Sequence, residues 1–226
     1  MQLKVIGSGS SGNCYLLTNG EETLVIEAGI RFLEVKKALN FNIRSIKGVI
    51  ISHVHGDHAG YAAEYEAAGI PVWKPYTMEN LRNEIWLGNF EIYSFGVVHD
   101  VPCCGFLIKH SEIGRMLYVT DAEYVKYTFH NLSVMLIEAN YDAEIIDKSS
   151  AKFRHVVSGH LSLQTTLDCI KANRSDELNH IILCHLSEGN GDPEWFRKAV
   201  EGYAPIGCTV DVASPGLEVE LGDTPF

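Results

Sequence analysis

Four possible metal ligands follow one apolar run within six residues of chain. The run 48–51 continues as Ser52 and then His53-Val54-His55-Gly56-Asp57-His58. On an extended chain, residues two apart project to the same side, so the first two histidines should point together. Gly56 is expected to permit a tight turn that places Asp57 and His58 at the start of a helix. Imidazole and carboxylate are typical ligands of zinc, and also of manganese, iron and nickel, so the segment predicts a metal site.

Three further polar residues follow strand-like runs elsewhere in the chain. His99 comes after the runs 91–95 and 96–98, Asp121 after 116–120, and His185 after 180–184. A single His or Asp at the end of a strand is more often structural than functional. Because all three share the placement of the 53–58 segment, they favour one common site at the ends of several strands.

The elements that must hold these residues are short and alternate between strand and helix. Helical periodicity is found over 32–39, 59–68, 163–172 and 194–203, and Asp192-Pro193 precedes the last of these as a capping pair. Strand-like runs occur at 3–6, 15–17, 23–26, 48–51, 71–73, 91–95, 105–108, 116–120, 134–137, 180–184 and 209–212. This mixture predicts an α/β fold of two packed sheets with helices outside, formed as a single domain over residues 1–226.

The composition excludes some classes of protein. The 226 residues include 18 Lys and Arg against 29 Asp and Glu, a net charge of −11, which argues against coating nucleic acid or anionic membrane with the whole surface. The six cysteines show no zinc-finger or disulfide-framework spacing, which is typical of a reducing compartment. With no signal-like N-terminus and no apolar run near ~20 residues, we expect a cytoplasmic protein that does not cross a membrane.

The ligand pattern resembles that of a known superfamily. His53 to His58, together with His99, Asp121 and His185, resembles the dinuclear metal signature of the metallo-β-lactamase superfamily. Further phrases at 7–13, 158–162, 184–190 and 215–218 resemble the YycJ/WalJ-like group of phosphodiesterases and exonucleases, which is related to tRNase Z. The similarity extends from about Leu3 to Leu221.

The resemblance implies a four-layer αβ/βα sandwich with two divalent metal ions, zinc or alternatively manganese, at one edge between the sheets. A hydroxide bridging two such ions would attack the phosphorus of a phosphodiester, so no Ser or Cys nucleophile is needed. The implied ligands are His53, His55 and His99 for one ion, Asp57, His58 and His185 for the other, and Asp121 for both.

The resemblance also implies an acid for the leaving group. Superfamily members that cleave nucleic acids pair a His that binds no metal with a Glu, and His160 and Glu138 occupy the corresponding places. A carboxylate fixes the tautomer of such a His and raises its proton affinity, which suits a general acid. The structural alternative is a turn histidine in front of a helix that Ser162 caps.

Several positions depart from the family pattern or suit a purely structural role. Glu27 stands where the superfamily usually has Asp, and Leu163 where the related group commonly has Asn. Cys103 and Cys104 follow His99 but are expected in the core. The glycine- and serine-rich loop 7–13 is either an ordinary turn or a source of backbone N–H groups for a phosphate.

The sequence predicts a dinuclear-metal hydrolase that cleaves phosphodiester bonds, with DNA or RNA as substrate. The alternatives are a phosphodiesterase for a small cyclic or modified nucleotide and a metal-binding regulatory protein without catalysis. Four basic residues near the first helix, Lys36, Lys37, Arg44 and Lys47, are expected to be a solvated face rather than a nucleic-acid track. A homodimer remains open.

Overall fold

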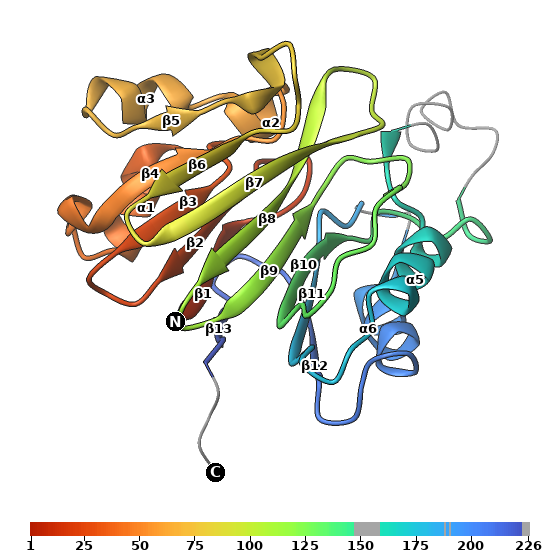
Figure 1. Cartoon of the computed structure of the whole chain (residues 1–226). Coiled ribbons are helices and arrows are strands. Elements are labelled where there is room, and N and C mark those ends of the chain that lie inside the picture. Colours follow the sequence, from red (N-terminus) through yellow and green to blue (C-terminus); the bar gives the residue numbers. More distant parts are fainter. Residues whose placement is uncertain (147–158, 188, 190, 223–226) are drawn as a thin grey trace.

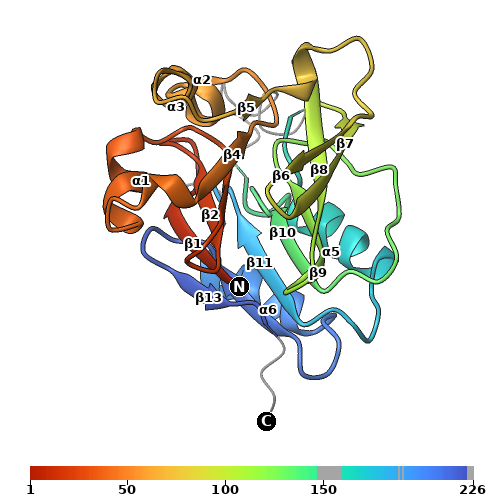
Figure 2. The same ribbon diagram turned by 60° about the vertical axis from the view of Figure 1, so that its left-hand side comes forward.

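Two β-sheets pack face to face in the computed structural model, which describes residues 1–146, 159–187, 189 and 191–222 (Figures 1 and 2). The first sheet has the order β13-β1-β2-β3-β4-β5 and the second has the order β12-β11-β10-β9-β8-β7-β6. The strands of the first sheet are β1 (Gln2–Gly7), β2 (Cys14–Thr18), β3 (Thr23–Ile26), β4 (Ile46–Ile50), β5 (Val72–Trp73) and β13 (Glu218–Glu220). Those of the second are β6 (Glu84–Leu87), β7 (Phe90–Val97), β8 (Cys103–His110), β9 (Gly114–Val119), β10 (Val134–Glu138), β11 (His180–Cys184) and β12 (Thr209–Val212).

Helices cover the outer faces of both sheets, which gives four layers. The helices are α1 (Phe32–Ala38), α2 (Gly56–Ala59), α3 (Ala62–Ala67), α5 (Leu163–Ala172) and α6 (Pro193–Glu201), with 3-10 turns η1 (Ile43–Ser45) and η2 (Pro75–Thr77). One apolar cluster joins α1 and α3 to the first sheet, and another joins α5 and α6 to the second. The expected αβ/βα sandwich is confirmed.

The main core lies between the two sheets. Leu3 and Tyr15 from the first sheet and Phe106 and Tyr118 from the second are fully buried in one cluster. Strands β10 and β11 are buried on both faces, because the first sheet covers one face and helices cover the other. This explains why their sequences are continuous apolar runs rather than alternating ones.

Parallel pairing brings the ends of several strands to one edge. Strand β4 pairs in parallel with β3 and β5, and β10 pairs in parallel with β9 and β11. The carboxyl ends of parallel strands lie at the same edge of a sheet. The residues that follow β4, β9, β10 and β11 therefore meet, and these include most of the polar residues singled out above.

Most predicted elements are confirmed, and three are wrong or missed. The helix expected over 59–68 is two helices, because the N–H of Tyr61 donates to the carbonyl of Ala28 instead of continuing the helical ladder. The two missed strands, β6 and β13, are edge strands that pair with β7 and β1. Strand β13 is Glu-Val-Glu and mostly exposed, so it has no apolar run. Strand β6 alternates instead, because Ile85 and Leu87 pack against the core while Glu84 and Trp86 are exposed.

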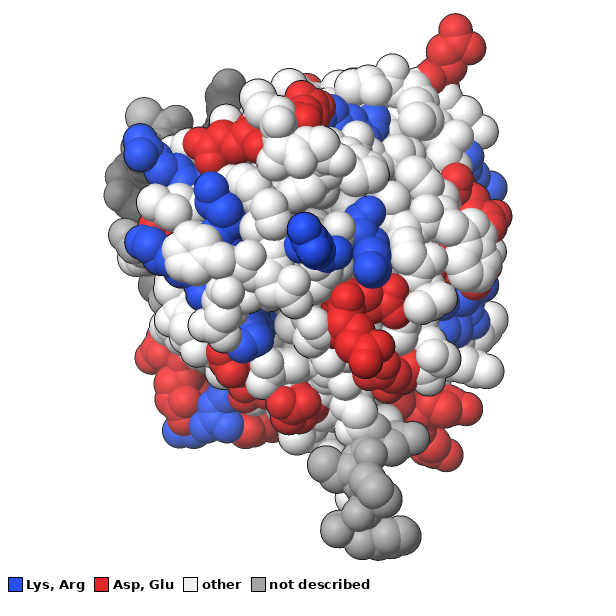
Figure 3. Space-filling model, turned by 90° about the vertical axis from the view of Figure 1, so that its left-hand side faces the viewer, with Lys and Arg blue, Asp and Glu red and all other residues white. Residues whose placement is uncertain are grey.

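Part of the sequence pattern lies outside the described residues, namely Ser158, Glu188 and Asn190 of the family-like phrases. Within the described ranges, none of the helices has both the length and the hydropathy needed to cross a bilayer. On the face nearest α1 and α3, Lys and Arg side chains form separate groups divided by white and red surface (Figure 3). Of the four basic residues singled out near the first helix, Lys37 and Arg44 are exposed, and Lys36 and Lys47 are partly buried.

Candidate metal centre

The 53–58 segment is held in place by backbone contacts with the first sheet. Its carbonyls at Asp57 and His58 accept hydrogen bonds from the N–H groups of Asn13 and Ala28, both at 2.7 Å. Gly29 packs so closely that an added Cβ would lie 1.7 Å from the carbonyl oxygen of Asp57. These contacts fix the segment before any ligand is considered.

Gly56 does not have the predicted role. It begins helix α2 outside the left-handed region, and a Cβ there would meet nothing within 4 Å. The rings of His53 and His55 nevertheless lie side by side, with centroids 4.7 Å apart. Asp57 and His58 are in the first turn of α2, as expected.

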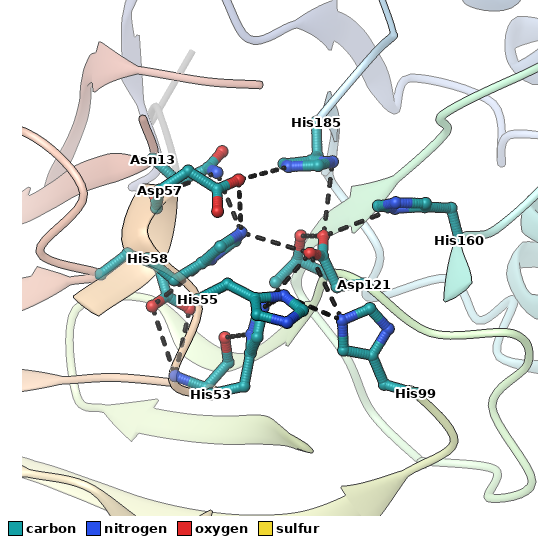
Figure 4. A network of polar contacts seen from close by, with 12 residues as sticks. Asn13, His53, His55, Asp57, His58, His99, Asp121, His160 and His185 are labelled. Carbon is teal, nitrogen blue, oxygen red and sulfur yellow. Dashed lines mark hydrogen bonds and ion pairs between the residues drawn. The ribbon is translucent and has the colours of Figure 1, made fainter. Parts of the chain in front are cut away.

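The first group of donor atoms combines three imidazoles with one carboxylate. His55 Nδ1 lies 3.1 Å from His53 Nε2 and 3.4 Å from His99 Nε2. Asp121 Oδ2 lies 3.4 Å from His53 Nε2 and 3.9 Å from His99 Nε2. Figure 4 shows the four side chains pointing toward one another, two from the 53–58 segment and one each from the loops that hold His99 and Asp121.

The second group shares the same carboxylate. His58 Nε2 lies 3.4 Å from both Asp121 Oδ2 and Asp57 Oδ2, and His185 Nε2 lies 3.4 Å from Asp57 Oδ2. Asp121 therefore belongs to both groups. Together with it, the donor atoms of His53, His55 and His99 lie within 4.8 Å of one another, and so do those of Asp57, His58 and His185. The structure thus brings together all seven residues that the sequence proposed as ligands.

The spacing of the donor atoms fits divalent metal ions. Zinc bonds of ~2.0–2.1 Å at tetrahedral angles place neighbouring ligand atoms about 3.4 Å apart. The observed separations, from 3.1 Å between the first two histidines to 3.9 Å between His99 and Asp121, surround this value. Clustered imidazoles and carboxylates are the donors that such ions prefer.

The charges in the centre perturb one another strongly. Burial alone would raise the pKa of Asp121, but the charges of His185 and His58 hold it well below its usual range. Burial alone would lower the pKa of His185, but the charge of Asp121 and the hydrogen bond to Asp57 raise it to about 10. His99 differs, because burial lowers its pKa to about 4. Perturbed values clustered at one place are typical of functional sites.

His160 and Glu138 form a buried pair beside this centre. His160 Nδ1 lies 2.7 Å from Glu138 Oε1, and the rings of His160 and His185 stack with centroids 5.3 Å apart. The charge of Glu138 raises the pKa of His160 above its usual value although burial opposes it. Ser162 also caps α5 by accepting from the N–H of Thr165. His160 therefore lies in front of a capped helix, as the structural alternative expects, and also contacts Glu138.

Several residues that contact the ligands were not predicted for that role. Ser8 Oγ accepts from the N–H of His185 at 3.0 Å, and Asn13 Nδ2 lies 3.0 Å from His58 Nε2. Asn140 Nδ2 donates to the carbonyl of His185 at 2.8 Å. The glycines and serines of the 7–13 loop could have indicated a role near the site, but no sequence pattern around Asn140 indicates that it contacts His185.

Glu27, which stands where the superfamily usually has Asp, contacts the 53–58 segment with its carboxylate. Its carboxylate oxygens accept from the N–H of Ser52 at 3.2 and 3.3 Å, and one lies 3.6 Å from His58 Nδ1. Glu27, Asp121 and His185 all have positive φ, at 67°, 48° and 52°. Non-glycine residues in this region are uncommon and cluster at functional sites.

The cysteines are not part of the centre. Cys103, Cys104 and Cys184 are fully buried, and Cys104 and Cys184 belong to the core between the sheets. Burial raises the pKa of the Cys104 thiol to about 12. The expectation of core cysteines is confirmed.

Comparison with known proteins agrees with the fold. Residues 7–82 match the profile of the Metallo-beta-lactamase superfamily. The chain is 26% identical over 231 residues to Exodeoxyribonuclease YycJ of Bacillus anthracis, covering 88% of each protein. It is 26% identical over 243 residues to Exodeoxyribonuclease WalJ of Streptococcus pneumoniae, covering 92% of this chain and 90% of that protein. The crystal structure of the metallo-beta-lactamase fold protein YhfI from Bacillus subtilis superposes with a TM-score of 0.69 at 17% identity, covering 97% and 99% of the two chains.

The fold, the donor set and the profile match together define a class. Residues 7–82 match a Metallo-beta-lactamase superfamily domain, and the chain is a metal-dependent hydrolase with a fold similar to that of the superfamily. Within this class, its sequence is similar to the YycJ and WalJ exodeoxyribonucleases over most of their length.

Proposed function

We propose that this hydrolase uses two divalent metal ions to cleave phosphodiester bonds of nucleic acid. The observation that carries the proposal is the 2.7 Å contact between His160 and Glu138, directly beside two donor groups that share Asp121. Alkoxide leaving groups of nucleic acids need a proton, and a carboxylate-held histidine can provide it. The named activity of the YycJ and WalJ relatives supports the same substrate class.

The proposed ligands follow the two groups. His53, His55 and His99 would hold one ion, Asp57, His58 and His185 would hold the other, and Asp121 would contact both. Bound there, two divalent ions would polarise the phosphoryl oxygens and lower the pKa of a water molecule. We propose zinc, with manganese as the alternative, because both accept imidazole and carboxylate ligands.

Glu138 and His160 would together protonate the leaving oxygen, with Glu138 positioning His160. Glu138 accepts at His160 Nδ1, so His160 Nε2 is the atom from which a proton would pass to the leaving oxygen. Two backbone N–H groups, of Ala122 at 3.3 Å and Leu161 at 3.1 Å, donate to Glu138 Oε2. The carboxylate is therefore fixed, and it fixes the tautomer of the histidine in turn.

A small cyclic or modified nucleotide is the second candidate substrate. On the face in Figure 3 the basic side chains form separate groups rather than a continuous track, and a small nucleotide would need no such track. A cytoplasmic location is also proposed, because all six cysteines are free thiols, as is typical of a reducing compartment. The single-domain organisation and the homodimer stay predictions.

The first test removes one proposed ligand. Asp57→Ala should lower the hydrolysis of bis-p-nitrophenyl phosphate by more than about 100-fold, because a carboxylate that contacts both His58 and His185 is lost. Circular dichroism should show an unchanged fold, since the Asp57 side chain is 23% exposed and belongs to none of the apolar clusters. Wild-type turnover in a folded Asp57→Ala protein would rule out the two-metal assignment.

A further inference from the structure

A cavity of about 610 Å³ lies on the outer face of the second sheet. Helices α5 and α6 cover this face over β10 to β12, whereas in the described chain no helix covers β7 to β9 (Figure 1). The cavity forms there, with Phe95, Leu107 and Phe129 among its apolar residues. None of the proposed metal ligands lines it.

Cationic side chains surround this apolar surface, and two of them lie over aromatic rings. The guanidinium carbon of Arg82 lies 5.0 Å from the ring centroid of Tyr127, and Lys109 Nζ lies 4.5 Å from that of Tyr93. Arg115 is the third cation of the lining, and its buried Nε has no hydrogen-bond partner among the described residues. Such cation–aromatic pairs hold the charges near the rings.

The cavity is more positive than the rest of the molecule. Its lining contains three cations and one carboxylate, Glu84, which gives 3 − 1 = +2 in a chain whose net charge is −11. A second carboxylate outside the lining, Glu91, lies 3.2 Å from Lys109 and offsets part of that charge. The remaining positive charge suits an anionic ligand, and the aromatic surface suits a flat apolar group on that ligand.

The segment between Asp121 and Tyr127 connects the cavity with the metal centre. The N–H of Glu123 donates to the carbonyl of Val98 at 2.8 Å, next to His99. Six residues of chain span at most about 20 Å, which is roughly the length of six stacked nucleotides at 3.4 Å each. A strand bound at the metal centre can therefore reach the cavity.

We infer that this cavity binds single-stranded nucleic acid at a distance from the bond that is cleaved. Unpaired bases stack on aromatic side chains while their phosphates meet basic ones, and this is the combination that the cavity offers. The inference rests on the proposed function, because that function supplies the choice of a nucleic-acid ligand. It adds a binding site that the metal centre does not contain.

The test measures binding of a fluorescein-labelled 12-nucleotide DNA single strand with phosphorothioate linkages to the metal-loaded protein by fluorescence anisotropy. Arg82→Glu should weaken binding by roughly 10-fold and reduce the slope of log affinity against log salt by about 0.7 for each lost phosphate contact. Tyr127→Ala should weaken binding by about 10-fold through lost stacking. Tyr127→Phe keeps the ring and should bind within about 2-fold of the wild type.

Arg44→Glu is the matched control, because it makes the same change of charge at an exposed residue of η1, outside the cavity lining. It should leave strand affinity unchanged. Wild-type affinity in both Arg82→Glu and Tyr127→Ala would overturn the inference, as would an equal loss in Arg44→Glu. A duplex that binds as tightly and with the same dependence on Arg82 would also overturn it, since paired bases cannot stack on the rings.

Turnover of bis-p-nitrophenyl phosphate by the wild-type protein separates this inference from the proposed function. Turnover combined with unchanged strand binding in the cavity variants overturns the cavity alone. Failure of the loaded protein to hydrolyse the diester, with strand binding lost in Arg82→Glu, overturns the proposed function alone.

Discussion

Glu138 joins the proposed acid to the proposed metal ligands. Its Oε1 lies 2.7 Å from His160 Nδ1 and 3.2 Å from His185 Nδ1, while Oε2 accepts two backbone N–H groups. Burial alone would raise the pKa of this carboxyl, but the charge and hydrogen bond of His160 lower it. One carboxylate therefore orients two histidines with different proposed roles.

The role of His160 is tested by the leaving group. His160→Ala should slow a poorly activated diester, such as a dinucleotide, by about 10²–10⁴-fold. It should slow bis-p-nitrophenyl phosphate far less, because nitrophenolate leaves without a proton. The ratio of kcat/KM for the two substrates is the measurement, and equal losses on both would show that His160 is structural.

The proposed metal ligands could be predicted from the sequence, but the residues that hold those ligands in position could not. His53, Asp57 and His58 lie within one short segment, so their spacing alone indicates a metal site. Asn140 and Ser8 reach His185 from segments that only the fold brings near. The left-handed backbone of Asp121 and His185 is likewise set by surrounding packing, which a local pattern cannot show.

The loop after β3 packs closely against the 53–58 segment, and a substitution there tests whether this packing holds the metal ligands in place. Gly29→Ala would drive a Cβ into the Asp57 carbonyl, 1.7 Å away, and into the N–H of Asn13, 2.6 Å away. We expect loss of bound metal, measured by mass spectrometry of the purified protein, and a lower Tm. Gly56→Ala, within the 53–58 segment itself, is the matched control and should keep its metal, because its Cβ meets open space. Full metal content in Gly29→Ala would contradict the packing argument.

A buried carboxylate next to β2 and β3 joins the two sheets and should make stability depend on pH. Glu22 accepts from the N–H of Asn89 at 3.0 Å and from its side chain at 2.9 Å, and Oε1 lies 3.0 Å from His110 Nε2. Burial alone would raise the pKa of Glu22, but these hydrogen bonds lower it. A lowered pKa in the folded state stabilises the protein fully above the unfolded value of about 4.3, and this contribution is lost as pH falls through the folded value.

Glu22→Gln should therefore reduce the free energy of unfolding by about 2 kcal/mol at pH 7 and by progressively less below about pH 4. Urea unfolding of both proteins across this range is the measurement. A difference that stayed constant down to pH 3 would show that the charge of Glu22 does not contribute.

The predicted elements were right where burial produces a pattern and wrong where pairing or tertiary contacts decide. Strands β10 and β11 were found as apolar runs because helices cover them, whereas β13 is a short, mostly exposed edge strand. The break between α2 and α3 arises from a hydrogen bond to Ala28, more than 30 residues away. No local propensity records such a contact.

Across the whole molecule, the acidic charge and the proposed function are compatible. Asp57, Asp121 and Glu138 carry part of the negative charge at the metal centre itself, where divalent ions would neutralise it. The net charge of −11 therefore excludes broad coating of nucleic acid, but it does not exclude local binding. Local binding is what the basic and aromatic cavity on the outer face would provide.

Titration of metal-free protein with zinc, and separately with manganese, tests the two-metal phosphodiesterase most directly. The rate of bis-p-nitrophenyl phosphate hydrolysis is followed against the molar ratio of metal to protein. We expect hydrolysis to be absent without metal and to rise until two equivalents are bound, with Asp121→Ala failing to reach that rate. Hydrolysis that needs no metal, or none with either metal at two equivalents, would contradict the proposed function.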